Sequence, residues 1–132
     1  MRNLLACLAA ASMLLVLPAS AQQSANTATD FYLGYRAAWS GASTMDPLLT
    51  YIAKDSRRDF EKMPPEQRKA VFDVMKQMGT IRNLKVVKET KTAGGFVLDV
   101  TGIGPDDKPA TGTVEIVWEG PVMKLKKEAW RS

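Results

Sequence analysis

The spacing of apolar residues along the chain changes once, at Gly79. Between residue 29 and Gly79 the apolar residues recur every three or four positions, which is the spacing of a helix with one buried face. Beyond Gly79 they alternate with polar residues, which is the spacing of a strand with one buried face. The chain is therefore predicted to fold as helices first and strands afterwards.

Local start and stop signals divide the first half into three helices. Thr27–Asp30 places a threonine three residues before an acid, which is typical of a helix N-terminus. Asp46-Pro47 is a second start signal, with Asp46 as the expected N-cap. Pro64-Pro65 stops that segment, and Pro65 begins a third helix that is expected to end at Gly79.

Turn residues divide the second half into four strands, expected at residues 84–91, 96–101, 113–118 and 122–130. Strict alternation sorts their side chains into two faces. The side chains expected to point inward are Phe96, Leu98, Val100, Val114, Ile116, Trp118, Met123, Leu125 and Ala129. Lys124, Lys126 and Glu128 are expected to point outward. The predicted fold class is α+β, with N-terminal helices packed on a curved four-stranded antiparallel sheet.

The first 21 residues have the three parts of a secretory signal peptide. Arg2 precedes an apolar run from residue 4 to residue 17, and Pro18 and the small residues 19–21 follow. Cleavage is expected between Ala21 and Gln22, which predicts a periplasmic or secreted protein. The run is shorter than the roughly 20 residues of a spanning helix, so no stable membrane anchor is expected after cleavage. Residues 22–28 are expected to be a flexible N-terminus, and residues 29–132 a single domain.

The composition excludes several kinds of catalytic and metal-binding site. The 132-residue chain has a formal net charge of +4, no histidine and one cysteine, Cys7, which lies in the signal peptide. Ser-His-Asp and Cys-His triads, disulfides and zinc sites built on cysteine pairs are therefore excluded. No glycine-rich phosphate loop is present. Neither a cofactor nor a metal is expected, and nucleic acid is not an expected partner because acids are interleaved with the lysines.

The last strand carries a resemblance to a known superfamily. Lys124, Glu128 and Trp130 match a Lys and a final Glu-x-Trp, whereas Met123 stands where a tryptophan is more usual. With residues 64–68 at the third helix and residues 112–114 in the third strand, this ending resembles small secreted bacterial domains of the nuclear transport factor 2-like, cystatin-like superfamily. The resemblance extends from residue 29 onward. It implies a cone-shaped fold that serves enzymes, ligand binders, immunity proteins and interaction modules alike.

Two candidate sites follow from the residues. An apolar ligand pocket is expected to use Tyr35, Trp39, Phe72, Phe96 and Trp118, which the fold places on inward faces. An acid and hydroxyl site would use Asp30, Tyr51 and Asp99, as enzymes that combine a carboxylate base with a tyrosine donor do. Asp30 is equally explained as a first-turn helix acid, and Asp99 by its outward position on a strand.

Methionines and lysines offer further interpretations. Met75 and Met78 have the spacing of a thioether pair for Cu(I), but they also continue the apolar face of the third helix. The lysines of the first and last strands suit solvated sheet edges, or contact with an anionic surface.

The leading hypothesis is a non-enzymatic binding or interaction domain, with an unknown protein or a small apolar ligand as its partner. An isomerase or dehydratase that uses Asp and Tyr in a cone cavity remains an alternative. An inhibitor of an envelope enzyme, or an immunity-type protein, is the other.

Overall fold

The computed structural model describes residues 27–132 and confirms the α+β class. The signal peptide and its cleavage site, predicted for residues 1–21, lie outside the described residues, as does most of the expected flexible N-terminus. The helices are α1 (Ala28–Gly41), the 3₁₀ helix η2 (Asp46–Tyr51), α2 (Lys54–Lys62) and α3 (Pro65–Met78). The strands are β1 (Arg82–Lys91), β2 (Gly95–Ile103), β3 (Pro109–Glu119) and β4 (Val122–Arg131).

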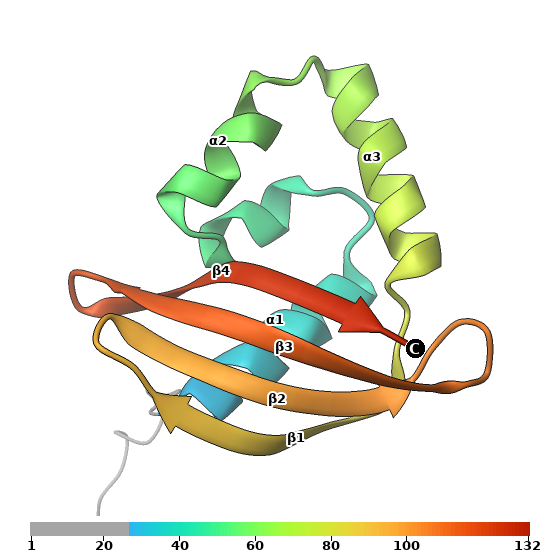
Figure 1. Cartoon of the computed structure of the whole chain (residues 1–132). Coiled ribbons are helices and arrows are strands. Elements are labelled where there is room, and N and C mark those ends of the chain that lie inside the picture. Colours follow the sequence, from blue (N-terminus) through green and yellow to red (C-terminus); the bar gives the residue numbers. More distant parts are fainter. Residues whose placement is uncertain (1–26) are drawn as a thin grey trace, which may run out of the picture.

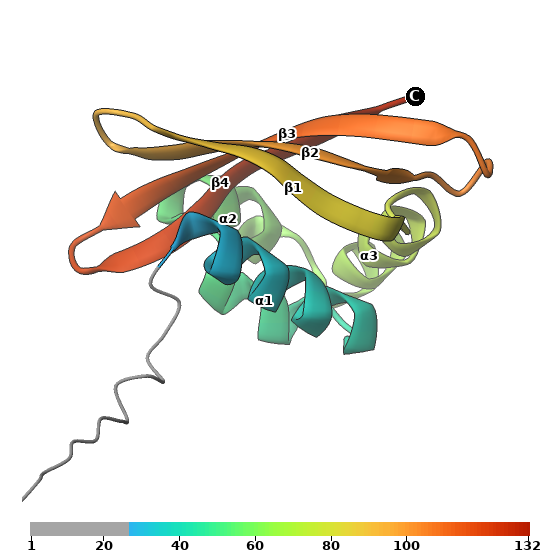
Figure 2. The same ribbon diagram turned by 90° about the horizontal axis from the view of Figure 1, so that it is seen from below.

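The four strands form one antiparallel sheet in the order β1-β2-β3-β4, and all helices lie on the same face of it (Figures 1 and 2). Helix α1 lies against the sheet, whereas α2 and α3 extend beyond β4 (Figure 1). The core fills the space between α1 and the sheet. Its largest fully buried side chains are Tyr32, Phe72, Leu48, Leu98, Ile116, Val100 and Val114. None of the helices described between residues 27 and 132 is long and apolar enough to cross a membrane.

The predicted second helix is two separate elements. Ile52 is extended, and it forms a parallel bridge with Leu125, while the Ala53 amide donates to the Leu125 carbonyl at 2.8 Å. This short segment therefore covers the free edge of β4. The N-cap of η2 is Met45, not Asp46 as predicted, and the Asp46 carboxylate instead accepts a hydrogen bond from Arg68.

Strand β4 contains a β-bulge that the alternation of the sequence did not predict. Leu125 pairs with Ile116 and Lys127 pairs with Glu115, so one step on β3 corresponds to two residues on β4. The extra residue reverses the faces of everything that follows it. Ala129, predicted to point inward, is exposed, and Glu128, predicted to point outward, lies against α1.

Helix α2 supports the bulge from the side. The Ser56 hydroxyl donates to the carbonyl oxygen of Lys126, the extra residue, at 2.9 Å. This bond gives a partner to a carbonyl at the bulge, where the ladder of β4 is interrupted. The two helical segments after α1 thus help to set the direction of the last strand.

Candidate functional site

A cluster of four polar and aromatic side chains joins α1 to β4. It consists of Tyr32, Arg36, Glu128 and Trp130, and we call it the Glu128 cluster. Tyr32 and Arg36 are four residues apart on one face of α1, and Glu128 and Trp130 are two apart on one face of β4. The bulge in β4 is what turns Glu128 and Trp130 towards the helix.

All hydrogen bonds of the Glu128 carboxylate end on the same oxygen. The Tyr32 hydroxyl donates to Oε2 at 2.5 Å, the Trp130 Nε1 at 3.0 Å and the Arg36 Nη1 at 3.4 Å. No hydrogen bond within residues 27–132 ends on Oε1. Three donors therefore hold the carboxylate by one oxygen, and its other oxygen has no hydrogen-bond partner among the described residues.

Arg36 is fixed by two further contacts. Its Nη2 donates to the Gly79 carbonyl at 2.8 Å, and its guanidinium carbon lies 4.3 Å from the centre of the Trp39 ring. The side chains of Arg36 and Glu128 are only 10% and 13% exposed. A buried pair of opposite charges thus connects α1, the end of α3 and β4, and its formal charge is zero.

The pKa values of two tyrosine hydroxyls of α1 are raised by these surroundings. Burial raises the pKa of Tyr32 far above its ordinary value of 10, and the Glu128 carboxylate raises it further. The pKa of Tyr35 is also raised, again first by burial and then by Glu128. Arg36 opposes both shifts to a smaller extent. Both hydroxyls therefore keep their protons into the alkaline range, beyond the pH at which an ordinary tyrosine ionises.

Stability is expected to fall at alkaline pH because of these two groups. In the unfolded chain both hydroxyls ionise near pH 10, whereas in the folded protein they keep their protons to higher pH. Their contribution is complete below about pH 10 and is lost above it, by about 1.4 kcal/mol per pH unit for each tyrosine. Urea unfolding between about pH 9 and pH 11 measures this slope. Tyr32→Phe should make it shallower, and an unchanged slope would contradict the assignment.

A hollow of about 290 Å³ lies over the Glu128 cluster. Its walls come from α1, from the last two turns of α3 and from the end of β4. They are formed by Tyr35, Arg36, Trp39, Val74, Met75, Met78, Gly79, Glu128 and Trp130. Most of this lining is aromatic or aliphatic, so the Glu128 cluster supplies the polar groups of an otherwise apolar site.

Two neighbouring hollows continue this one at both ends. One of about 300 Å³ shares Val74 and Met75 with it, and one of about 280 Å³ shares Met78 and Trp130. We call the three together the α3 groove. Ala70, Val74 and Met78 follow one another at four-residue spacing, so they form one face of α3. Val74 and Met78 are 52% and 72% exposed, although both are apolar. The groove is thus an elongated apolar surface with no cover among the described residues.

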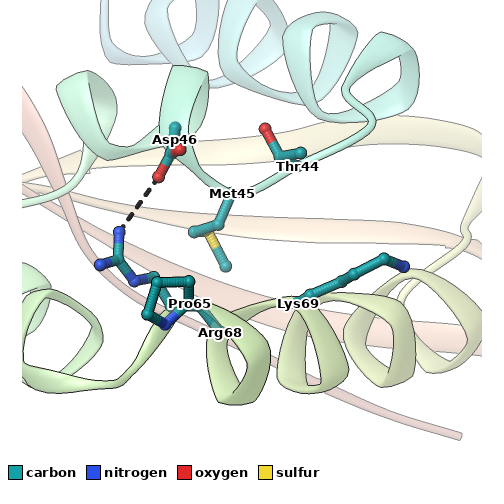
Figure 3. A pocket seen from close by; sticks show the side chains of 6 residues that line it. All are labelled: Thr44, Met45, Asp46, Pro65, Arg68 and Lys69. Carbon is teal, nitrogen blue, oxygen red and sulfur yellow. Dashed lines mark hydrogen bonds and ion pairs between the residues drawn. The ribbon is translucent and has the colours of Figure 1, made fainter.

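A larger hollow of about 440 Å³ lies elsewhere, between η2 and the start of α3 (Figure 3). Figure 3 shows the Arg68 guanidinium reaching to Asp46, with Met45 near the centre. Arg68 and Asp46 are 3.2 Å apart, and Lys69 pairs with Asp73 at 2.9 Å. Four of the six residues that line this hollow are polar or charged, so it lacks the aromatic and aliphatic walls of the α3 groove.

The structure divides the five predicted pocket residues between two places. Tyr35 and Trp39 line the hollow over the Glu128 cluster, and Phe72 is buried in the core beside them. Phe96 and Trp118 pack on each other at the opposite end of the sheet from Trp130, with ring centres 6.1 Å apart. Trp118, expected to be inward, is 46% exposed. The five residues therefore do not form one pocket.

The predicted acid and hydroxyl residues are placed apart from any carboxylate–tyrosine contact. Asp30 and Asp99 are exposed, the first in the first turn of α1 and the second on β2. Tyr51 is half-buried, and its ring lies beside the rings of Phe31 and Tyr35. The carboxylate that does contact a tyrosine hydroxyl belongs to Glu128, whose position in the strand alternation had predicted an outward side chain.

No metal centre emerges from residues 27–132, where no group of three or more Asp, Glu, His or Cys side chains has a suitable arrangement. Met75 is half-buried and Met78 is largely exposed, and both belong to the α3 groove.

Two signals in the sequence pointed to the Glu128 cluster. Arg36 interrupts the buried face that Tyr32, Tyr35 and Trp39 form on α1, and a charged residue in such a position needs a partner. Glu128 and Trp130 form the Glu-x-Trp ending of the superfamily resemblance. Neither signal gives the direction of Glu128, which depends on the bulge.

Family models, curated proteins and solved structures were each compared with the chain, and none matched. We therefore infer function from the geometry of the Glu128 cluster and of the α3 groove.

Proposed function

We propose that the mature chain is an exported, non-enzymatic binding domain that captures an apolar segment of a partner polypeptide in the α3 groove. The observation that carries this proposal is the row of three adjoining hollows with Val74 and Met78 exposed along it. An exposed contiguous apolar surface on a small domain is typical of an interaction site. Its elongated form suits a chain segment with several apolar side chains better than one compact molecule.

Catalysis by the Glu128 cluster has less support than binding. A catalytic donor must come within hydrogen-bond distance of the reacting group, and the Tyr32 side chain is fully buried. Its hydroxyl, the Trp130 indole and Arg36 are all engaged by Glu128 Oε2. These contacts favour a rigid recognition surface over a proton-transfer site. An inhibitor or immunity-type role is one form that capture of a partner can take.

Export belongs to the proposal because residues 1–21 have the parts of a signal peptide. The helices on one face of the sheet also suit the cone of the nuclear transport factor 2-like superfamily, and we propose membership on that basis. The N-terminal sequence of the protein recovered from the cell envelope or medium tests export, and it should begin at Gln22.

A selection of displayed peptides tests capture directly. Random peptides of about ten residues, long enough to follow the groove, are selected on the immobilised mature chain. The enriched peptides are then measured against Val74→Gln/Met78→Gln, which keeps good helix formers on α3 but removes two apolar side chains. Binding is expected to weaken by about tenfold or more, because the peptide loses apolar contact area.

The matched control is Val87→Gln, which changes a valine of similar exposure on β1, outside the groove. Peptide affinity should be unchanged in this variant. Failure to enrich any peptide, or equal affinity for the groove variant and the control, would overturn the proposal. Binding of a compact apolar molecule such as indole, with no peptide enriched in the selection, would replace the polypeptide segment by a small ligand.

A further inference from the structure

We propose that the middle hollow of the α3 groove selects an aromatic group with one uncharged hydrogen-bond donor, and that Glu128 Oε1 is the atom that recognises the donor. In a captured polypeptide such groups are the indole of tryptophan and the phenol of tyrosine. This inference rests on the proposed function and names the chemistry that its central hollow recognises.

One oxygen of the Glu128 carboxylate, Oε1, is free to accept a hydrogen bond from a guest. Oε2 accepts from Tyr32, Arg36 and Trp130, whereas no hydrogen bond of the described residues ends on Oε1. A carboxylate oxygen in a protein interior needs donors, and water supplies them while the hollow is open. A guest that covers Oε1 without donating to it leaves a charged acceptor desolvated, so a guest with a donor is favoured.

The charged side chains around the hollow favour an uncharged guest. Arg36 already balances Glu128 in the wall of the hollow. The Lys76 ammonium is directed to the end of α1, where it donates to the carbonyls of Trp39 at 2.7 Å and Ser40 at 3.2 Å. Because the Arg36–Glu128 pair is formally neutral, a charged guest would lose its hydration without meeting an unpaired counter-charge in the hollow. A neutral N–H or O–H group can donate to Oε1 without that desolvation cost.

The size and the lining of the hollow suit an aromatic ring. Its volume of about 290 Å³ lies at the lower limit of ligand pockets, which suits one ring system. Trp39, Tyr35 and Trp130 provide aromatic walls, and Met75 and Met78 provide polarisable thioethers that pack well against aromatic rings. The Trp130 indole donating to Oε2 already shows that this carboxylate accepts from such a group.

Two nearly isosteric probes test the inference. Indole carries an N–H, and benzofuran carries an ether oxygen in its place. Both are titrated into the ¹⁵N-labelled mature protein, and their affinities are read from amide shifts of the residues that line the hollow. Indole is expected to bind about tenfold more tightly than benzofuran, as a hydrogen bond to a charged acceptor predicts.

Glu128→Gln separates recognition from packing. The glutamine oxygen can still accept from Tyr32 and Trp130, while its NH₂ group takes the place of Oε1 and presents a donor. The preference for indole should fall to about equal binding of the two probes. Glu115→Gln makes the same chemical change on the opposite face of the sheet, and there the preference should persist.

Several results would overturn the inference. These are equal affinity of the wild type for both probes, no shift at the hollow with either probe, or an indole preference that survives in a folded Glu128→Gln protein. If that variant fails to fold, the wild-type protein is titrated with 1-methylindole, which lacks the N–H donor. This probe should then bind like benzofuran. The peptide selection tests capture by the groove independently of this inference. If peptides bind but indole and benzofuran bind equally, the α3 groove remains the proposed binding site, and the preference for a hydrogen-bond donor is wrong.

Discussion

Replacing Arg36 by methionine is expected to lower the free energy of unfolding by about 3 kcal/mol. Methionine retains the apolar stem, but the Glu128 carboxylate then lies buried without its counter-charge, and the Gly79 carbonyl loses its donor. Removing one partner of a buried pair is destabilising chiefly because the remaining charge stays desolvated. Urea unfolding at neutral pH measures the effect.

A double variant tests the physical reason. Arg36→Met/Glu128→Gln removes both charges while leaving an oxygen for Tyr32 and Trp130, so it should be more stable than Arg36→Met alone. Arg58→Met removes an exposed ion pair with Asp55 and should change stability by about 0.5 kcal/mol or less. If Arg36→Met behaves like Arg58→Met, the pair contributes no more than a surface contact.

Replacing Gly95 by alanine is expected to destabilise the protein by about 3 kcal/mol or more. A methyl group at this position would lie 1.9 Å from the carbonyl oxygen of Ile116, and 2.8 Å from its carbonyl carbon. Both atoms belong to the backbone of β3, and Gly95 pairs with β3 through Val117. The clash cannot be relieved by a side-chain rotation, so β2 and β3 would have to separate.

Gly94 provides a matched control one residue earlier. An added methyl group there meets no atom within 4 Å, and Gly94→Ala should change stability by about 0.5 kcal/mol or less. Thermal unfolding of the two variants gives the comparison. Equal midpoints for Gly94→Ala and Gly95→Ala would mean that the close approach of β2 and β3 is not present in solution.

Much of the fold follows from local signals. Thr27 caps α1 through its hydroxyl, which accepts from the Asp30 amide at 3.0 Å, as the sequence predicted. Pro65 begins α3, and the alternation on β2 correctly places Leu98 and Val100 in the core. These predictions succeed because a cap, a proline and the period of a strand act over a few neighbouring residues.

The pocket prediction was less accurate because it depended on which elements meet. Trp118 has the correct parity for the inner face, but its side chain is 46% exposed, whereas Met123, its partner on β4, is buried. Met78 reads as a core residue at helical spacing, yet at the end of α3 it is 72% exposed and lines a hollow together with Ile81 and Trp130. Periodicity predicts which face of a helix or strand a side chain lies on, but it does not predict whether another element packs over that face.

The sequence by itself determined the order of the elements, their class and most of their boundaries, since those depend on contacts between near neighbours. Only the tertiary structure decided the candidate site. One extra residue in β4, with Ser56 bonded to the Lys126 carbonyl, reverses the alternation and turns Glu128 towards Tyr32 and Arg36. A bulge is set by the pairing of two strands and by the helix beside them, and alternation within a single strand does not reveal it.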